Sequence, residues 1–129
     1  MGTFKVDAKS TPGMLRCHLK GSLSDTEVRA FVTEHDAAIR SFGTMPYRVF
    51  VDLRELLPLA PSAAAIMANA KEFSSSRSNF RGSAVLVTSR LIALQHRRTS
   101  EAAGVLDTEF TSESEDECWN FLRKVHRST

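Results

Sequence analysis

The residues from Tyr47 to Ala70 read YRVFVDLRELLPLAPSAAAIMANA, and this stretch decides the fold. It begins with a nearly continuous apolar run, Val49–Leu53, that is too short for a helix and is typical of a strand buried on both faces in a parallel sheet. A turn-like segment, Arg54–Pro61, then leads into an alanine-rich helix predicted over Ala63–Phe73. Ligands and partners of open α/β sheets gather where central strands end, so this junction is the first candidate for a functional site.

The chain before this stretch predicts a hairpin and a helix. Apolar and polar residues alternate over 3–8 and again over 15–20, and Pro12-Gly13 between them is typical of an antiparallel hairpin. Ser24 and Glu27 form a capping box in front of a helix that ends near Gly43. The apolar face of this helix has three-four spacing and consists of Val28, Phe31, Val32, His35, Ile39 and Phe42.

The chain after Ala70 predicts two more strands and two more helices. A fully apolar strand covers 84–87, a helix covers 91–103 and stops at Gly104, and a last strand at the sheet edge includes Val105, Leu106 and Phe110. Ser114 and Glu117 then form a second capping box before a helix whose apolar stripe includes Cys118 and Leu122. All internal glycines are expected at boundaries between elements.

The predicted element order is therefore β-β-α-β-α-β-α-β-α. Right-handed crossovers between the strands predict an α/β fold with a mainly parallel sheet and helices packed against it. No internal repeat or linker divides the chain, so residues 1–129 are expected to form one domain.

Composition favours a cytoplasmic protein. The chain has 129 residues, of which 42% are apolar and 25% charged, and no apolar run approaches the ~20 residues of a membrane span. A net charge of +2 gives no support for nucleic-acid binding. Cys17 and Cys118 are read as buried, reduced thiols. Six basic residues between Lys71 and Arg98, followed by an acidic segment over 113–117, suggest a dipolar surface that steers a charged partner.

The element order and the strand-end segment Val51-Asp52-Leu53-Arg54-Glu55-Leu56 resemble the STAS domain family. The likeness is greatest to its divergent STAS-like branch, which is related to lipid-binding modules of the CRAL-TRIO type. This resemblance implies a bacterial regulatory module that is not an enzyme and that binds a kinase-like anti-sigma protein or a sensor protein.

The resemblance also draws attention to Ser62. In the family, a serine at the start of the helix after the third strand is phosphorylated in a pattern similar to Asp-Ser-Ser-Gly. The matching stretch here is Ala60-Pro61-Ser62-Ala63, which lacks both the Asp and the Gly. A phosphate at Ser62 would gain from the helix dipole, but a serine at a helix start is more often a plain N-cap.

The sequence offers no catalytic, metal or cofactor site. The four histidines have no metal-ligand spacing on one helix face, and His35 is read as a core histidine. Glycine-rich phosphate-binding loops and the hydrolase nucleophile elbow are both missing from the sequence. Asp52, at the end of the central strand, is expected to accept backbone hydrogen bonds in the turn. We therefore expect a protein that is not an enzyme and holds no cofactor.

Two functions remain open at this point. The first is a protein-interaction module that binds a partner, or a second copy of itself, through Arg54, Leu56, Leu57, Leu59 and Ser62. The apolar run 56–59 is expected to be exposed, which favours a homodimer. The second is a carrier of a small apolar or lipid ligand, which needs a cavity of about 300 Å³ or more lined by residues such as Phe50, Met67 and Phe73.

Overall fold

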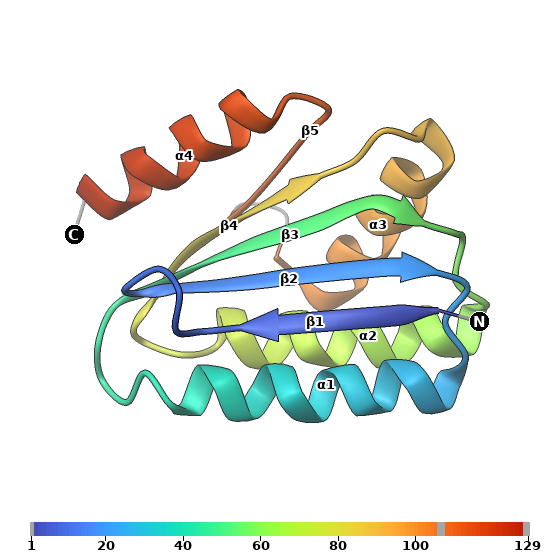
Figure 1. The fold of residues 1–129 in the computed structure, drawn as a ribbon, viewed down its shortest axis with the longest axis horizontal. Helices are drawn as coiled ribbons and strands as arrows, with labels where there is room; N and C mark the ends of the chain where they lie inside the picture. The colour runs from blue at the N-terminus through green and yellow to red at the C-terminus, as the bar shows by residue number, and fades with distance from the viewer. Residues whose placement is uncertain (1, 106–107, 128–129) are drawn as a thin grey trace.

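The computed structural model of the chain describes residues 2–105 and 108–127, and it contains the nine predicted elements in the predicted order (Figure 1). The strands are β1 (Thr3–Asp7), β2 (Met14–Gly21), β3 (Tyr47–Leu56), β4 (Phe80–Leu86) and β5 (Glu109–Ser112). The helices are α1 (Asp25–Arg40), α2 (Pro61–Ser75), α3 (Arg90–Ala103) and α4 (Glu115–Arg127). Leu106, which was assigned to the last strand, lies outside the described residues.

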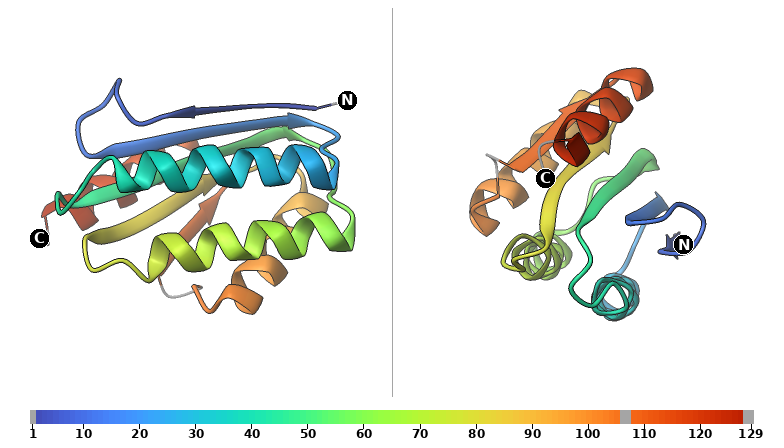
Figure 2. Two further views of the ribbon diagram at one scale, coloured as in Figure 1. Left: turned by 90° about the horizontal axis from the view of Figure 1, so that it is seen from below. Right: turned by 90° about the vertical axis from the view of Figure 1, so that its left-hand side faces the viewer.

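The five strands form one sheet in the order β1-β2-β3-β4-β5. β1 and β2 form the predicted antiparallel hairpin, and every later strand runs parallel to its predecessor. Because each right-handed crossover moves to the next strand in the same direction, α1, α2 and α3 lie on one face of the sheet. α4 lies on the opposite face, over β3, β4 and β5 (Figure 2). The mainly parallel α/β architecture predicted from the sequence is thus confirmed.

The local helix signals act largely as predicted. Ser24 and Glu27 complete a reciprocal capping box at α1, and Gly104 ends α3 in the left-handed conformation. At α4 only half of the second box forms: Ser114 accepts the Glu117 N–H at 3.3 Å, whereas the Glu117 carboxylate accepts the Ser112 hydroxyl at 2.7 Å. Both cysteine thiols are buried and free, and burial raises the pKa of the Cys17 thiol to about 12.

The hydrophobic core has two parts of unequal size. The larger part lies between the sheet and α1–α3, and it receives Tyr47, Val49 and Leu53 from β3. The smaller part lies under α4 and receives Phe50 from the other face of β3. The prediction of a strand covered on both faces therefore holds for Val49–Leu53, where no side chain is exposed, whereas Arg54, which was assigned to the turn, is the first exposed residue of β3.

An irregularity near the end of β3 changes which side chains enter the core. His18 pairs with Asp52, but Lys20 pairs with Glu55, so β3 carries one more residue than β2 over this interval. This β-bulge places Leu53 and Leu56, three residues apart, in the same core. The first three residues of the predicted turn, 54–56, consequently belong to the strand.

Gly82 does not mark an element boundary as predicted, because it lies inside β4. Its φ angle is +147°, and a Cβ atom there would approach the Val125 side chain of α4 to 3.3 Å. The glycine therefore allows α4 to pack closely on the sheet. None of the helices in the described part of the chain has both the length and the apolar character needed to cross a membrane.

Candidate functional site

The loop between β3 and α2 is fastened to α3 by one glutamine side chain. The Gln95 Oε1 atom accepts the Leu59 N–H at 2.8 Å, and the Gln95 side-chain amide donates to the Leu59 carbonyl at 2.5 Å. Leu59 is half-buried and packs against the larger core. Because both polar groups of the Leu59 main chain are held, the loop has a fixed path at the carboxyl edge of the sheet.

Of the three leucines in this segment, only Leu57 is exposed to solvent. Leu57 is 55% exposed, whereas the preceding Leu56 is only 7% exposed. The expectation that the whole run 56–59 is exposed is therefore wrong. The bulge in β3 turns Leu56 inward, and the contact with Gln95 fixes Leu59 against the core.

The first two turns of α3, which follows the carboxyl end of β4, add two further exposed leucines. Leu91 is 61% exposed and Leu94 is 47% exposed. Leu91 lies four residues before Gln95, on the same face of α3, and Gln95 contacts the loop that carries Leu57. We call Leu57, Leu91 and Leu94 the leucine patch.

Arg54 lies beside this edge in a charged cluster. Its guanidinium donates to Asp52 at 2.8 and 3.1 Å, and its Nη1 atom lies 3.7 Å from the Glu115 carboxylate of α4. Partial burial opposes ionisation of Asp52, but hydrogen bonds and the charge of Arg54 outweigh it and lower the pKa of that carboxyl. The Arg54 N–H also donates to Asp52 at 3.0 Å, which is the backbone hydrogen bond expected from the sequence.

Ser62 is not the cap of α2. The N-cap residue is Ala60, which makes no side-chain hydrogen bond, and Pro61 is the first helical residue. The exposed Ser62 hydroxyl instead donates to the Asp25 carboxylate at the start of α1, at 2.9 Å. Proline has no N–H, so one of the four donors that a cap would serve is missing from this helix start.

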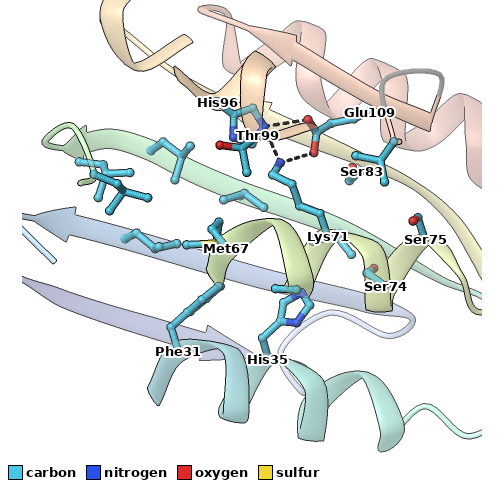
Figure 3. Close-up of a pocket in the computed structure, with 18 of the residues that line it drawn as sticks. Phe31, His35, Met67, Lys71, Ser74, Ser75, Ser83, His96, Thr99 and Glu109 are labelled. Atoms are coloured by element: carbon cyan, nitrogen blue, oxygen red, sulfur yellow. Dashed lines mark hydrogen bonds and ion pairs between the residues drawn. The ribbon is translucent and has the colours of Figure 1, made fainter. Parts of the chain in front are cut away.

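A cavity of about 70 Å³ lies between the sheet and the three helices α1, α2 and α3 (Figure 3). Met67 lines it, as predicted. Phe50 lies on the other face of the sheet, where it stacks on Trp119 with the ring centroids 4.4 Å apart. Phe73 packs under the guanidinium groups of Arg40 and Arg77 and does not line the cavity. The three residues predicted to surround one ligand are thus separated.

The size of this cavity does not fit the predicted carrier, which needs about 300 Å³ or more. A second hollow of about 420 Å³ runs between α3 and β5. Its lining includes the exposed residues Leu94, Arg97 and Thr111, so it is a surface groove and not a closed ligand cavity.

The polar end of the 70 Å³ cavity holds a trio that the sequence did not reveal: Lys71 of α2, His96 of α3 and Glu109 of β5. The Lys71 Nζ atom lies 2.8 Å from Glu109 Oε2 and 2.9 Å from His96 Nε2, and the last atom lies 2.8 Å from Glu109 Oε1 (Figure 3). Their side chains are buried, with Glu109 6% exposed. Lys71, which the sequence counted among surface charges, is therefore an interior group.

His35 occupies the opposite wall of the cavity. It is buried, as predicted, and its Nδ1 atom lies 2.8 Å from the Asp36 carboxylate. Burial lowers the pKa of the imidazole more than Asp36 raises it. Within the described residues, no cluster of three or more histidine, cysteine or acidic side chains could hold a metal ion.

No protein-family model and no curated protein sequence matches the chain significantly. Among the solved structures that match its fold are two with a TM-score of 0.64 each. One is an uncharacterised DUF3478-family protein with a SpoIIAA-like fold from Shewanella loihica PV-4, 15% identical, in which the match covers 94% of this chain and 93% of that one. The other is an anti-sigma factor antagonist from Mycobacterium paratuberculosis, 16% identical, with 95% of each chain covered.

The chain has a SpoIIAA-like fold. At this level of identity the likeness concerns the fold alone, and it agrees with the STAS-like architecture predicted from the sequence. The link to CRAL-TRIO modules stays a prediction.

Within the SpoIIAA-like fold, the predicted contact residues are only partly brought together. Arg54 and Leu57 are exposed at the carboxyl edge of the sheet, and Ser62 is exposed in the first turn of α2, which follows the same loop. Leu56 and Leu59 serve the core instead. From the sequence, Leu91 was assigned to the apolar inward face of its helix. In the structure Ile92 occupies the core, and Leu91 is therefore directed to the surface.

Proposed function

We propose that residues 1–129 act as a cytoplasmic, non-catalytic regulatory module that binds a protein partner at the leucine patch. The proposal rests on one observation: the Leu57 side chain is exposed, and the main chain of the loop that carries it is held in place. The side chain is more than half exposed on a loop whose main chain is fixed by Gln95. An apolar contact that is already ordered loses little conformational entropy when a partner covers it.

Two further features support a protein partner. Exposed apolar side chains that lie near one another tend to mark contact surfaces, and Arg54 adds an exposed charged group at the same edge of the sheet. The fold is shared with an anti-sigma factor antagonist, which makes kinase-like anti-sigma proteins and sensor proteins the first partners to test.

Self-association through the same patch is part of this proposal. A homodimer would cover Leu57, Leu91 and Leu94 with the same residues of a second copy. Light scattering at micromolar concentration measures this directly, and a monomer mass would remove the homodimer while leaving the binding of another protein to be measured.

Phosphorylation of Ser62 is the regulatory step that we propose for this surface. The hydroxyl is exposed at the start of α2, where helix N–H groups favour a phosphate. Its present partner is the Asp25 carboxylate, so a phosphate there would repel the start of α1. The modification would therefore change the contact between α1 and α2, the helix that follows the loop carrying Leu57.

The test compares two substitutions at equally exposed apolar residues. Leu57→Asp lies in the patch, whereas Met45→Asp lies in the loop before β3, at the other end of the sheet, and both side chains are 55% exposed. Binding to purified anti-sigma kinases and sensor proteins of the source organism is measured by calorimetry. We expect Leu57→Asp to weaken binding by about tenfold or more and Met45→Asp to leave it unchanged. Equal effects of the two substitutions would refute the patch as the binding surface.

A further inference from the structure

The buried trio of Lys71, His96 and Glu109 places one carboxylate beside two nitrogen groups that can each carry a proton. Glu109 supplies the single negative charge, and its Oε1 atom also accepts the Ser100 hydroxyl. The three polar groups come from three different elements and meet within 2.9 Å of one another. A carboxylate in this position needs one cation for neutrality, but a lysine and a histidine are both present.

The hydrogen-bond geometry leads to the same conclusion. The His96 Nε2 atom lies within hydrogen-bond distance of both Lys71 Nζ and Glu109 Oε1. This nitrogen carries either a lone pair or a hydrogen, so it cannot accept from Lys71 and donate to Glu109 at the same time. When a proton passes from the ammonium group to the imidazole, His96 becomes the cation beside Glu109, Lys71 becomes a neutral amine, and the net charge of the trio is unchanged.

Burial makes the loss of the Lys71 proton easier, because it lowers the pKa of this lysine in spite of Glu109. Burial and the charge of Lys71 also lower the pKa of His96, so the imidazole is neutral at rest and holds a transferred proton only transiently. The groups that face Lys71 are His35 from α1, His96 from α3 and Glu109 from β5. Only Glu109 among them is an acid that opposes loss of the lysine proton.

The amine lies at the wall of a cavity that could admit a small molecule. Lys71, Met67 and Val51 all line this space of about 70 Å³ (Figure 3). An engineered apolar cavity of about 150 Å³ takes up benzene, so half that volume suits a molecule of only a few heavy atoms. The Lys71 side chain keeps 11% of its surface exposed, which gives such a molecule a route to it.

We propose that Lys71 is a nucleophilic lysine that captures small aldehydes or ketones as a Schiff base. The amine lone pair forms a bond to the carbonyl carbon, and the proton that His96 took from the ammonium group passes to the carbonyl oxygen, which gives a carbinolamine. His96 Nε2, now neutral, accepts a second proton from the nitrogen and returns it to the departing hydroxyl, which leaves as water. The products are a protonated imine on Lys71 and one water molecule, with no change of oxidation state. This activity is independent of the leucine patch.

The test labels the intact protein with propanal and sodium cyanoborohydride, which reduces an imine to a stable amine, and maps the modified lysines by mass spectrometry. Lys20 is the internal control, since it is exposed and also lies near a carboxylate, Glu55, at 3.7 Å. At about pH 7 we expect Lys71 to react about tenfold faster than Lys20, because a lower pKa leaves more of the amine neutral. A rate at Lys71 no higher than that at Lys20 would overturn the proposal and leave the trio as a structural ion pair.

Two further experiments test whether the cavity selects small aldehydes and whether His96 takes part in the reaction. Pyridoxal phosphate is too large for the cavity, so it is expected to label Lys20 and to spare Lys71. Labelling of Lys71 by both aldehydes would show that the cavity does not select its ligand, and it would overturn that part of the proposal.

His96→Asn, with folding checked by circular dichroism, should slow propanal capture at Lys71 and shift its pH profile while leaving Lys20 unchanged. An unchanged profile would exclude the proton transfer to His96.

Discussion

Gln95 of α3 holds the main chain of Leu59 from both sides, accepting its N–H at 2.8 Å and donating to its carbonyl at 2.5 Å. Gln95→Met keeps the length of the side chain but removes both hydrogen bonds. We expect a loss of about 1–3 kcal/mol in the free energy of unfolding, because two main-chain groups lose their partners. Partner binding should also weaken, since Leu57 is no longer held in place. Urea denaturation and calorimetry measure the two effects, and unchanged values for both would contradict the role given to Gln95.

Acid should destabilise the protein through Glu109. Burial opposes ionisation of this carboxyl, but the hydrogen bond from His96 and the charge of Lys71 prevail and lower its pKa from 4.5 to about 2. The unfolded chain therefore takes up the proton first as the pH falls. The stabilisation is fully present above about pH 4.5, is lost progressively toward about pH 2, and amounts to about 3 kcal/mol.

The matched variant for this pH dependence is Glu109→Gln. The free energy of unfolding of this variant should no longer fall, through residue 109, as the pH decreases from about 4.5 to about 2. At neutral pH it should also be destabilised by about 3–5 kcal/mol, because Lys71 and His96 remain buried without a counter-charge. Unfolding curves measured across the acid range check both results, and an identical acid profile in wild type and variant would show that another carboxyl is responsible.

Neighbouring leucines at the end of β3 should respond in opposite ways to the same substitution. Leu57→Asp changes an exposed side chain, so the free energy of unfolding should stay within about 0.5 kcal/mol of the wild type. Leu56→Asp places a carboxylate in the core and should cost several kcal/mol. Denaturant midpoints compare the two variants. Unfolding caused by Leu57→Asp would mean that this loop is part of the core.

Ser62 should contribute little to stability in its unmodified form. Ser62→Ala removes one exposed hydrogen bond to Asp25, with an expected cost of about 0.5 kcal/mol, less than the ~1 kcal/mol of a lost N-cap. Ser62→Glu adds a charge near Asp25 and should lower the melting temperature. The decrease should be smaller in an Asp25→Asn background, which a double-mutant cycle measures. Equal decreases in both backgrounds would show that Asp25 does not sense a charge at position 62.

The order of the elements was readable from the sequence because its signals are local. The alternation on both sides of Pro12-Gly13, the Ser24–Glu27 box and the glycine after α3 act within a few residues of themselves. Right-handed crossovers then leave few arrangements for the strands. The junction after the central strand was found for the same reason, since it is marked by a strand ending and a helix beginning.

The side chains that face solvent or one another were decided only by tertiary structure. The extra residue in β3 appears when this strand is paired with β2, and it sends Leu56 into the core although its neighbour Leu57 is exposed. Lys71, His96 and Glu109 lie 25 and 13 residues apart along the chain and meet because α2, α3 and β5 pack together. Strand register and helix docking depend on contacts between distant parts of the chain, which a local pattern of polar and apolar residues does not encode.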